Sequence, residues 1–293
     1  MKSKTYVLVG LGVVGGSFAK ALHKTRQTGE RILAIDLDVN TLQTAQEEGV
    51  IDAGETQNKT FLQQADVVII SLYPLQMRDF LVEYGDQIKD GAIVTDVVGI
   101  KGALIDQLAD VIPPQVDFIY GHPMAGRENK GYAYSDDSVF HGANYILTPI
   151  DSNKPANIIF LTELIHRLGF KQITATSPKE HDQMIAHTSQ LAHVIATALI
   201  NSDLEERETN RFVGDSYRDL TRIANINESL WSELYLVNKE ALLDELVRFE
   251  EAFDKIKEAI QAEDKLAIEE ELNKGKVRRI ELEQNDFKLN DKI

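Results

Sequence analysis

The stretch Gly10-Leu11-Gly12-Val13-Val14-Gly15 follows the apolar run Tyr6–Val9 and opens a helix-like segment, Ser17–Lys24. A second apolar run, Ile32–Ile35, ends in Asp36, twenty-one residues after the last glycine of the stretch. Strand, glycine-rich turn, helix, strand and terminal acid, in this order, form the dinucleotide-binding fingerprint of doubly wound α/β folds. The alternative is a glycine-rich turn of some other α/β protein, which the spacing to the acid disfavours.

The three glycines of this turn have different physical tasks. Gly10 permits the sharp turn, Gly12 lets backbone N–H groups approach a pyrophosphate, and Gly15 lets the helix pack closely on the strand. The N-terminus of the following helix supplies partial positive charge for the phosphates.

The acid at the end of the second strand predicts which cofactor is bound. Asp36 can accept hydrogen bonds from both hydroxyls of the adenosine ribose, whereas a 2′-phosphate would meet like-charge repulsion. No Arg or Lys follows in 37–41 to offset that repulsion, so the sequence favours NAD over NADP. The expected cofactor-binding residues are Gly10, Leu11, Gly12, Val13, Val14, Gly15, Asp36, Ser71, Leu72 and Tyr73.

Composition excludes several classes of protein. The chain of 293 residues is long enough for one large domain or two. It contains no Cys, which excludes disulfides, a thiolate nucleophile and Cys-based metal sites, and we expect no metal. The net charge of −16 argues against nucleic acid and anionic membranes as partners. The N-terminus does not resemble a signal peptide and no apolar stretch is long enough to span a bilayer, which fits a cytoplasmic protein.

Two regions of different periodicity follow one another along the chain. Up to Thr176, apolar runs alternate with helix-like segments, which predicts a parallel sheet covered on both faces and a Rossmann-type fold. From Ser177 the strand signals stop, and apolar residues recur at helical spacing in two stripes. We therefore expect a nucleotide-binding domain at 1–176 and an all-helical substrate-binding and dimerisation domain at 177–293. The stripes are Met184, Ile185, Leu191, Ile195 and Leu199, and then Leu246, Phe249, Phe253, Ile256 and Ile260.

Ligands of open α/β sheets bind beyond the carboxyl ends of the strands, where three segments of this chain emerge: 71–74, 96–102 and 121–128. His122, held by Pro123 and flanked by glycine, can accept a proton near neutral pH. From position alone, a hydrogen-bonded structural histidine is about equally favoured.

Three segments together resemble the prephenate dehydrogenase family. They are Gly121-His122-Pro123-Met124-Ala125-Gly126-Arg127-Glu128-Asn129-Lys130-Gly131, the run from Ser177-Pro178-Lys179-Glu180-His181-Asp182 to His193, and 214–224 with Trp231 beyond it. With the dinucleotide fingerprint, the matches span Val7 to about Glu240 in the family's order, which is far more specific than any one motif.

The resemblance implies an NAD-dependent oxidative decarboxylation of prephenate, or of its transaminated relative arogenate, by a homodimer with entwined helical domains. By resemblance, His122 is the catalytic base, and Arg222 binds a substrate carboxylate through its planar fork. The residues expected to contact substrate are Gly99, Glu128, Ser189, His193, Asp215, Arg222 and Trp231. At Gly99 many family members have a serine that assists the histidine, and at Asp215 many have glycine.

Other interpretations remain open for these residues. Ser189 and His193, four apart, also fit an ordinary polar helix face, and Arg222 also fits an ion pair with Asp219. His181 fits either a site or a packing role. A carboxylate at position 215 fits recognition of the arogenate ammonium, or a helix cap.

Prephenate is therefore the expected substrate, with arogenate as the alternative. A 3-hydroxyacid dehydrogenase of similar architecture, or a non-catalytic NAD-binding regulator, is a rival function.

Overall fold

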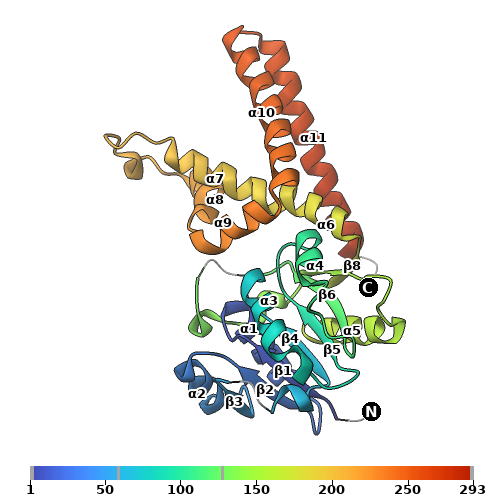
Figure 1. Ribbon diagram of the computed structural model, residues 1–293. Coiled ribbons are helices and arrows are strands. Elements are labelled where there is room, and N and C mark those ends of the chain that lie inside the picture. The colour runs from blue at the N-terminus through green and yellow to red at the C-terminus, as the bar shows by residue number, and fades with distance from the viewer. Residues whose placement is uncertain (1–2, 58–59, 127–128, 291–293) are drawn as a thin grey trace. The chain divides into compact units, whose positions relative to one another are not determined.

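The computed structural model describes residues 3–57, 60–126 and 129–290, with side chains as far as residue 284. The chain divides into two compact units, 1–239 and 240–293, which are described separately. The first unit contains the sheet and the helices up to α9, and the second contains most of α10 and all of α11 (Figure 1).

The first unit is built on an eight-stranded sheet in the order β3-β2-β1-β4-β5-β6-β7-β8. The first six positions follow the doubly wound order. In such folds the order of the strands reverses between β1 and β4, which are parallel here, and a crevice for a ligand opens at that point. The Rossmann-type fold predicted from the sequence is thereby confirmed. The strands are β1 (Thr5–Val9), β2 (Arg31–Ile35), β3 (Ala53–Glu55), β4 (Val67–Ile70), β5 (Ile93–Asp96), β6 (Asp117–Pro123), β7 (Asn144–Thr148) and β8 (Gln172–Ala175).

One pairing departs from the all-parallel sheet that the sequence predicts. β7 runs antiparallel to β6, with His122 opposite Ile146, and β8 then runs parallel to β7. Apolar runs covered on both faces look the same in either direction, so the sequence pattern could not show this reversal. The short strand β3 was also not predicted.

Helices cover both faces of the sheet (Figure 1). Tyr6 and Leu8 of β1 belong to one buried core, and Val7 and Val9 to another, as the period of two along a strand requires. Helices α1, α2 and α5 contribute to the first core, and α3 and α4 to the second. These helices are α1 (Val13–Lys24), α2 (Val39–Glu47), α3 (Pro74–Tyr84), α4 (Gly102–Leu108) and α5 (Pro155–Arg167), with short 3₁₀ turns η1 (Leu62–Gln64), η2 (Gly85–Gln87), η3 (Tyr132–Tyr134) and η4 (Asp137–Phe140).

The helical part of the first unit begins at a well-formed cap. The Ser177 side chain accepts a hydrogen bond from the Glu180 backbone N–H, and Pro178 occupies the first helical position. The single long helix that the stripe from Met184 to Leu199 predicts is interrupted by one π-helical turn. The elements are α6 (Pro178–Ile185), the π turn η5 (Ala186–Gln190), α7 (Leu191–Asn201), η6 (Thr209–Arg211), α8 (Asp215–Thr221), η7 (Arg222–Ala224) and α9 (Glu228–Val237).

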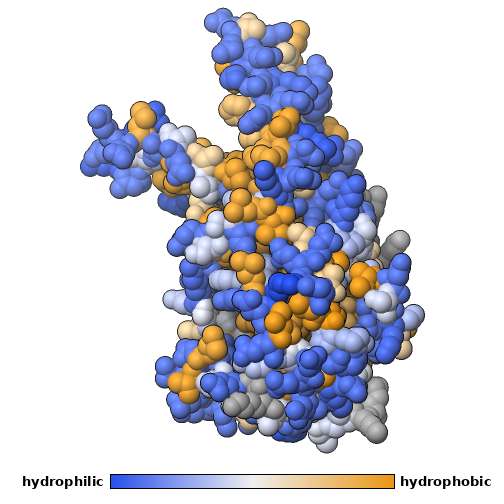
Figure 2. Space-filling view, in the orientation of Figure 1, coloured by the Kyte–Doolittle hydropathy of each residue, from blue (hydrophilic) through white to orange (hydrophobic). Residues whose placement is uncertain are grey.

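The second unit consists of two long helices, α10 (Lys239–Gln261) and α11 (Lys265–Asn290). Along α10 the expected apolar stripe is present, yet Phe253 and Ile260 are more than half exposed in the single chain. Figure 2 shows hydrophobic side chains interrupting the otherwise hydrophilic surface of these helices. Among the residues described, no helix has the length and apolar character needed to cross a membrane.

The glycine turn has the geometry that its sequence predicts. Gly10 has a φ of +87°, which L-residues with a side chain rarely adopt. A Cβ on Gly15 would lie 2.0 Å from the carbonyl oxygen of Gly10, so nothing larger than glycine fits there without moving the backbone. Gly12, in contrast, has nothing within 4 Å of its Cβ position.

We expect Gly15→Ala to lower the free energy of unfolding by about 1–3 kcal/mol or more, because overpacking forces the helix away from the strand. Gly12→Ala is the matched control, and its added methyl group meets open space in the protein. Urea unfolding followed by circular dichroism measures both. Equal stabilities of the two variants would contradict this account of the turn.

Candidate functional site

A cavity of about 540 Å³ lies beyond the carboxyl ends of β1, β2 and β4. Of the residues expected to bind the cofactor, six line it: Gly10, Gly12, Asp36, Ser71, Leu72 and Tyr73. The other four, Leu11, Val13, Val14 and Gly15, are not among its lining residues. Leu11 and Val13 are buried, and Val14 packs against the core. Six of the ten expected residues therefore line the cavity, and the other four lie in the glycine-rich turn and at the start of α1.

Asp36 lies at the end of β2 with its carboxylate held by the backbone. One oxygen accepts a hydrogen bond from the Leu11 N–H at 2.6 Å, and the other accepts from the Asp38 N–H at 2.8 Å. Asp79 and Glu83 also line the cavity, and no Lys, Arg or His is among its described lining residues. The described lining of the cavity thus offers carboxylates that can accept hydrogen bonds from ribose hydroxyls, and it offers no cationic side chain that could pair with a 2′-phosphate.

The residues around the cavity fit a dinucleotide. Gly12 is the N-cap of α1 and leaves the helix N-terminus open to the cavity, where backbone N–H groups favour phosphate. The Ser71 hydroxyl is buried without a hydrogen-bond partner among the residues described, so a polar donor or acceptor is available at the cavity wall.

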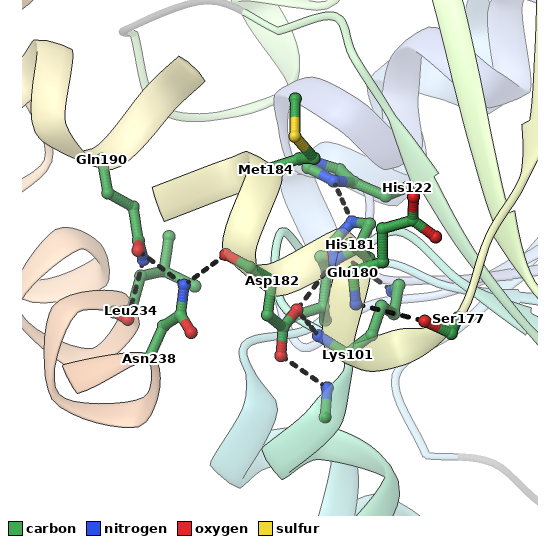
Figure 3. A network of polar contacts seen from close by, with 12 residues as sticks. Lys101, His122, Ser177, Glu180, His181, Asp182, Met184, Gln190, Leu234 and Asn238 are labelled. Atoms are coloured by element: carbon green, nitrogen blue, oxygen red, sulfur yellow. Dashed lines mark hydrogen bonds and ion pairs between the residues drawn. The ribbon is translucent and has the colours of Figure 1, made fainter. Parts of the chain in front are cut away.

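His122 lies near the carboxyl end of β6 and is partly buried. Its Nδ1 lies 2.9 Å from Nε2 of His181, and Nδ1 of His181 lies 2.7 Å from a carboxylate oxygen of Asp182 (Figure 3). Both partners come from the first turns of α6, so the strand that carries His122 and the helical region meet at this point.

The surroundings of His122 favour its neutral form. Burial, followed by the proximity of His181 and Lys101, holds the pKa of His122 well below the ordinary 6.5. Burial also lowers the pKa of His181, although the neighbouring Asp182 carboxylate opposes that shift. The neutral form of both imidazoles is therefore favoured near neutral pH.

Gly99 faces the other nitrogen of His122. A Cβ built on Gly99 would lie 3.5 Å from Nε2 of His122, at ordinary van der Waals distance. A serine at this position would bring its hydroxyl beside Nε2, which agrees with the family pattern noted above. In this chain no side chain extends from position 99 toward Nε2.

The loop between β5 and α4, which carries Gly99, is fixed by a buried ion pair. Lys101 and Asp96 have fully buried side chains, and the ammonium lies 2.5 Å from the carboxylate. The same Asp96 carboxylate accepts hydrogen bonds from the backbone N–H groups of Val98 and Gly121. The loop and the residue preceding His122 are therefore held by one side chain.

A second group of expected substrate residues comes together on α7 and α9. The rings of His193 and Trp231 contact each other with centroids 3.7 Å apart and an interplanar angle of 30°, and Tyr235 packs edge-on against Trp231. His193 donates a hydrogen bond to the Ser189 carbonyl oxygen, 2.9 Å away in the π turn. Single π turns inside helices often accompany functional sites, and here the turn sets where Ser189 lies relative to His193.

The other residues expected to contact substrate are Arg222, Asp215 and Glu128. Arg222 begins η7, which packs against α7. Asp215 lies in the first turn of α8, whose N-cap is Gly214, and its exposed side chain pairs with Arg218. The alternative of a capping Asp215 is therefore not observed. Glu128 lies outside the described residues.

Four residues that the structure places at the site were not among the expected site residues: His181, Asp182, Asp96 and Lys101. For His181 a site role and a packing role were both open, and Asp96 and Lys101 lie in the segment 96–102, which the sequence places at the edge where ligands bind. The helix-start pattern Ser177-Pro178-Lys179-Glu180 places His181 and Asp182 in the first turns of a helix. The contact of those turns with β6 and α4 depends on tertiary structure.

Two family models match this chain, one over the sheet-bearing part and one over the helical part. The family model described as the prephenate dehydrogenase nucleotide-binding domain matches residues 18–174, and the one described as the prephenate dehydrogenase dimerization domain matches 177–274. A prephenate dehydrogenase of Bacillus subtilis is 31% identical over 265 residues, which are 89% of this chain and 71% of the relative.

Solved structures are similar to nearly the whole chain. Prephenate dehydrogenase from Aquifex aeolicus, in complex with hydroxyphenyl propionate and NAD+, is 28% identical with a TM-score of 0.86, and the match covers 96% of this chain and 99% of that one. Synechocystis arogenate dehydrogenase is 25% identical with a TM-score of 0.80, covering 95% and 99%. With both domain models matched in order along the chain, this protein belongs to the prephenate dehydrogenase family.

Proposed function

We propose that this chain catalyses the NAD-dependent oxidative decarboxylation of prephenate to 4-hydroxyphenylpyruvate and CO2, a reaction of tyrosine biosynthesis. The observation that carries the proposal is His122, a neutral histidine at the carboxyl edge of the same sheet as the dinucleotide cavity. Membership of the prephenate dehydrogenase family supports the reaction class and the substrate.

In this proposal His122 acts as the base. The substrate ring carries a hydroxyl at C4 and a carboxylate at C1, and Nε2 of His122 takes the hydroxyl proton. Bound NAD supplies an acceptor for the hydride that leaves C4. The C–C bond to the carboxylate then breaks, its electron pair enters the ring, and CO2 departs from an aromatic product. The lowered pKa of His122 keeps Nε2 unprotonated for this step at neutral pH.

Residues of the helical region are proposed to hold the substrate. Arg222 would pair with a substrate carboxylate, and a planar guanidinium suits that task. The contacting rings of His193 and Trp231, with Ser189 one turn before His193, offer a polar and aromatic surface that suits a cyclic dienyl substrate. Glu128 and Gly99 complete the proposed contacts.

Arogenate remains the alternative substrate. It carries an ammonium where prephenate carries a keto group, and a carboxylate close to that group would favour it. Among the described residues the Asp215 carboxylate pairs across the surface with Arg218, and because its side chain is exposed a ligand can reach it. The similarity to Synechocystis arogenate dehydrogenase is consistent with this alternative.

The active form is proposed to be a homodimer. Large apolar side chains on the second unit are exposed in the single chain, among them Leu243, Val247, Phe253 and Ile260 on α10. Burial of such a stripe is worth about 25 cal/mol per Å² of apolar area, and a second copy of the same helices can supply it. The matched dimerization domain covers most of this region.

We retain a nucleotide-binding domain at 1–176 and a substrate-binding and dimerisation domain at 177–293, in line with the ranges of the two family models. The boundary between the two compact units of the structure instead falls after Lys239, because residues of α6 and the N-cap of α9 form hydrogen bonds with the part of the chain that carries the sheet. Asp182 bonds to the N-terminus of α4, and Asn227 bonds to the Tyr73 hydroxyl. The cytoplasmic location expected from the sequence stays a prediction.

The proposed activity is tested by following NAD reduction with prephenate, arogenate and a 3-hydroxyacid. We expect prephenate to give the highest kcat/KM, and His122→Asn to lose about 10²- to 10⁴-fold in kcat because a positioned base is removed. His23→Gln, at an exposed histidine on α1, is the control and should keep native turnover. Preference for the 3-hydroxyacid, or native turnover of His122→Asn, would refute the proposal.

Cofactor preference follows from the acidic cavity. NAD should exceed NADP in catalytic efficiency by at least about tenfold, which corresponds to about 1.4 kcal/mol of charge repulsion at the 2′-phosphate. Asp36→Asn should narrow that ratio chiefly by improving NADP. Similar efficiencies with the two cofactors in the native protein would contradict the role of Asp36.

Acid should destabilise the protein below about pH 6.5. His122 and His181 have lowered pKa values in the folded state, so below 6.5 the unfolded chain binds protons that the folded chain does not. The free energy of unfolding then falls as the pH falls toward the folded-state pKa values, and these two groups contribute no pH dependence above that window. Thermal melts at about pH 7.5, 6.5 and 5.5 should show a smaller decrease in Tm for His122→Asn than for the native protein. Parallel decreases would exclude His122 as a source of the effect.

The oligomeric state is measured by light scattering at micromolar concentration, where we expect the mass of two chains. Replacing Phe253 and Ile260 together by Glu should shift the mass toward one chain, because charges are costly in an apolar interface. A native mass of one chain would rule out the dimer.

A further inference from the structure

The Asp182 carboxylate is surrounded by N–H donors from two parts of the fold (Figure 3). One oxygen accepts from the Lys101 backbone N–H at 2.7 Å and lies 2.7 Å from Nδ1 of His181. The other oxygen accepts from the Gly102 N–H at 2.7 Å, at the N-terminus of α4. A Cβ on Gly102 would lie 2.9 Å from that oxygen, so glycine is what allows the approach.

These contacts determine which ring nitrogens carry protons. A carboxylate accepts hydrogen bonds only, so Nδ1 of His181 must be the donor to Asp182. A neutral imidazole has one N–H, so Nε2 of His181 is an acceptor, and the nitrogen 2.9 Å away, Nδ1 of His122, must donate to it. His122 is then left with an unprotonated Nε2, the nitrogen that faces Gly99.

We propose that His181 and Asp182 are positioning residues that fix the tautomer of His122, so that Nε2 is the atom presented to the substrate hydroxyl. The assignment of His122 as the base rests on the proposed function. The tautomer itself rests on the hydrogen-bonded chain from Asp182 through His181 to His122 and on the neutral form of both imidazoles.

The chain also accommodates the charge formed in the reaction. When Nε2 of His122 takes a proton, Nδ1 keeps donating to His181, whose Nδ1 keeps donating to Asp182, and no second proton has to move. Among the described residues, Lys101 is the charged side chain whose proximity disfavours a charged His122, and the Asp182 carboxylate on α6 is linked to His122 through His181. Lys101 is paired with Asp96, so Asp182 is the carboxylate that acts through His181.

The chain is held in place from the far side of α6. The Asn238 side-chain amide donates to the Asp182 carbonyl oxygen at 2.9 Å and to the Gln190 side-chain oxygen at 2.8 Å. Gln190 in turn donates to the Leu234 carbonyl oxygen of α9. All these groups are buried or partly buried, so α6 has little freedom to turn His181 away from His122.

The tautomer is measured directly by ¹⁵N NMR of protein labelled at the histidine ring nitrogens, with the His122 signals assigned by their loss in His122→Asn. At neutral pH we expect His122 to carry its proton on Nδ1 and to lack one on Nε2. A proton on Nε2 in the native protein would overturn the proposal, whatever the activity measurements show.

Three variants separate positioning from packing. His181→Leu removes the acceptor, and we expect kcat to fall by about 10- to 100-fold, part of what a positioned base contributes, with KM for NAD unchanged. Its His122 signals should shift toward the Nε2-protonated form. His181→Gln keeps an acceptor oxygen for Nδ1 of His122 and should recover most of the lost turnover. The control His23→Gln should be native in both measurements.

The outcomes distinguish this inference from the proposed function. Native turnover and an unchanged His122 tautomer in His181→Leu would overturn the positioning role while leaving His122 as the base. Equal losses in His181→Leu and His181→Gln, with the native tautomer in both, would show a packing role only. If His181→Leu does not fold, the proposal is still tested by the tautomer of His122 in the native protein and by the turnover of His181→Gln, which should be close to native. Native turnover of His122→Asn would refute the role of His122 as the base, but it would not refute the assignment of its proton to Nδ1.

Discussion

The buried ion pair between Asp96 and Lys101 fixes the loop on which the site depends. Both side chains are inaccessible to solvent, and the carboxylate also binds the N–H groups of Val98 and Gly121. Removing one partner of such a pair typically costs about 3–5 kcal/mol, because the remaining charge is buried without compensation. Through this pair, the end of β5, the start of α4 and the residue before His122 have a single relative arrangement.

Helix α6 adds the second constraint from the other side of the site. Its position is set locally by Ser177 and Pro178, and its first turns present His181 and Asp182 to β6 and α4. A carboxylate at the N-terminus of α4 is also favoured by the helix dipole. The same interaction therefore joins the helical region to the sheet and orients the proposed base.

The negative charge of the molecule constrains how an anionic substrate can be bound. The chain carries a net charge of −16, and the dinucleotide cavity is lined by Asp36, Asp79 and Glu83. Such a field disfavours polyanions in general, so an anionic substrate has to be held by a local cation. In the proposed function Arg222 fills that need, while Lys101 is committed to Asp96.

The sequence by itself determined the doubly wound half of the sheet, the dinucleotide turn, Asp36 and the helical nature of the second half. Each of these depends on short-range rules: glycine at a positive φ, alternation along a strand, and helical spacing of apolar residues. Gly10 and Asp36 were identified because their partners lie close by in the fingerprint. The family resemblance pointed to His122, Ser189, His193 and Trp231, and the contacts between His193 and the other two were not known in advance.

Only the tertiary structure decided the direction of β7, the π turn that interrupts the α6–α7 helix, and the partners of His122. An apolar strand has the same pattern in either direction, and one inserted π residue barely changes an apolar stripe. His181 and Asp182 lie about 60 and 80 residues in sequence from His122 and Lys101, their respective contacts. Such contacts are set by how a capped helix packs on a sheet, and no local pattern of residues encodes that packing.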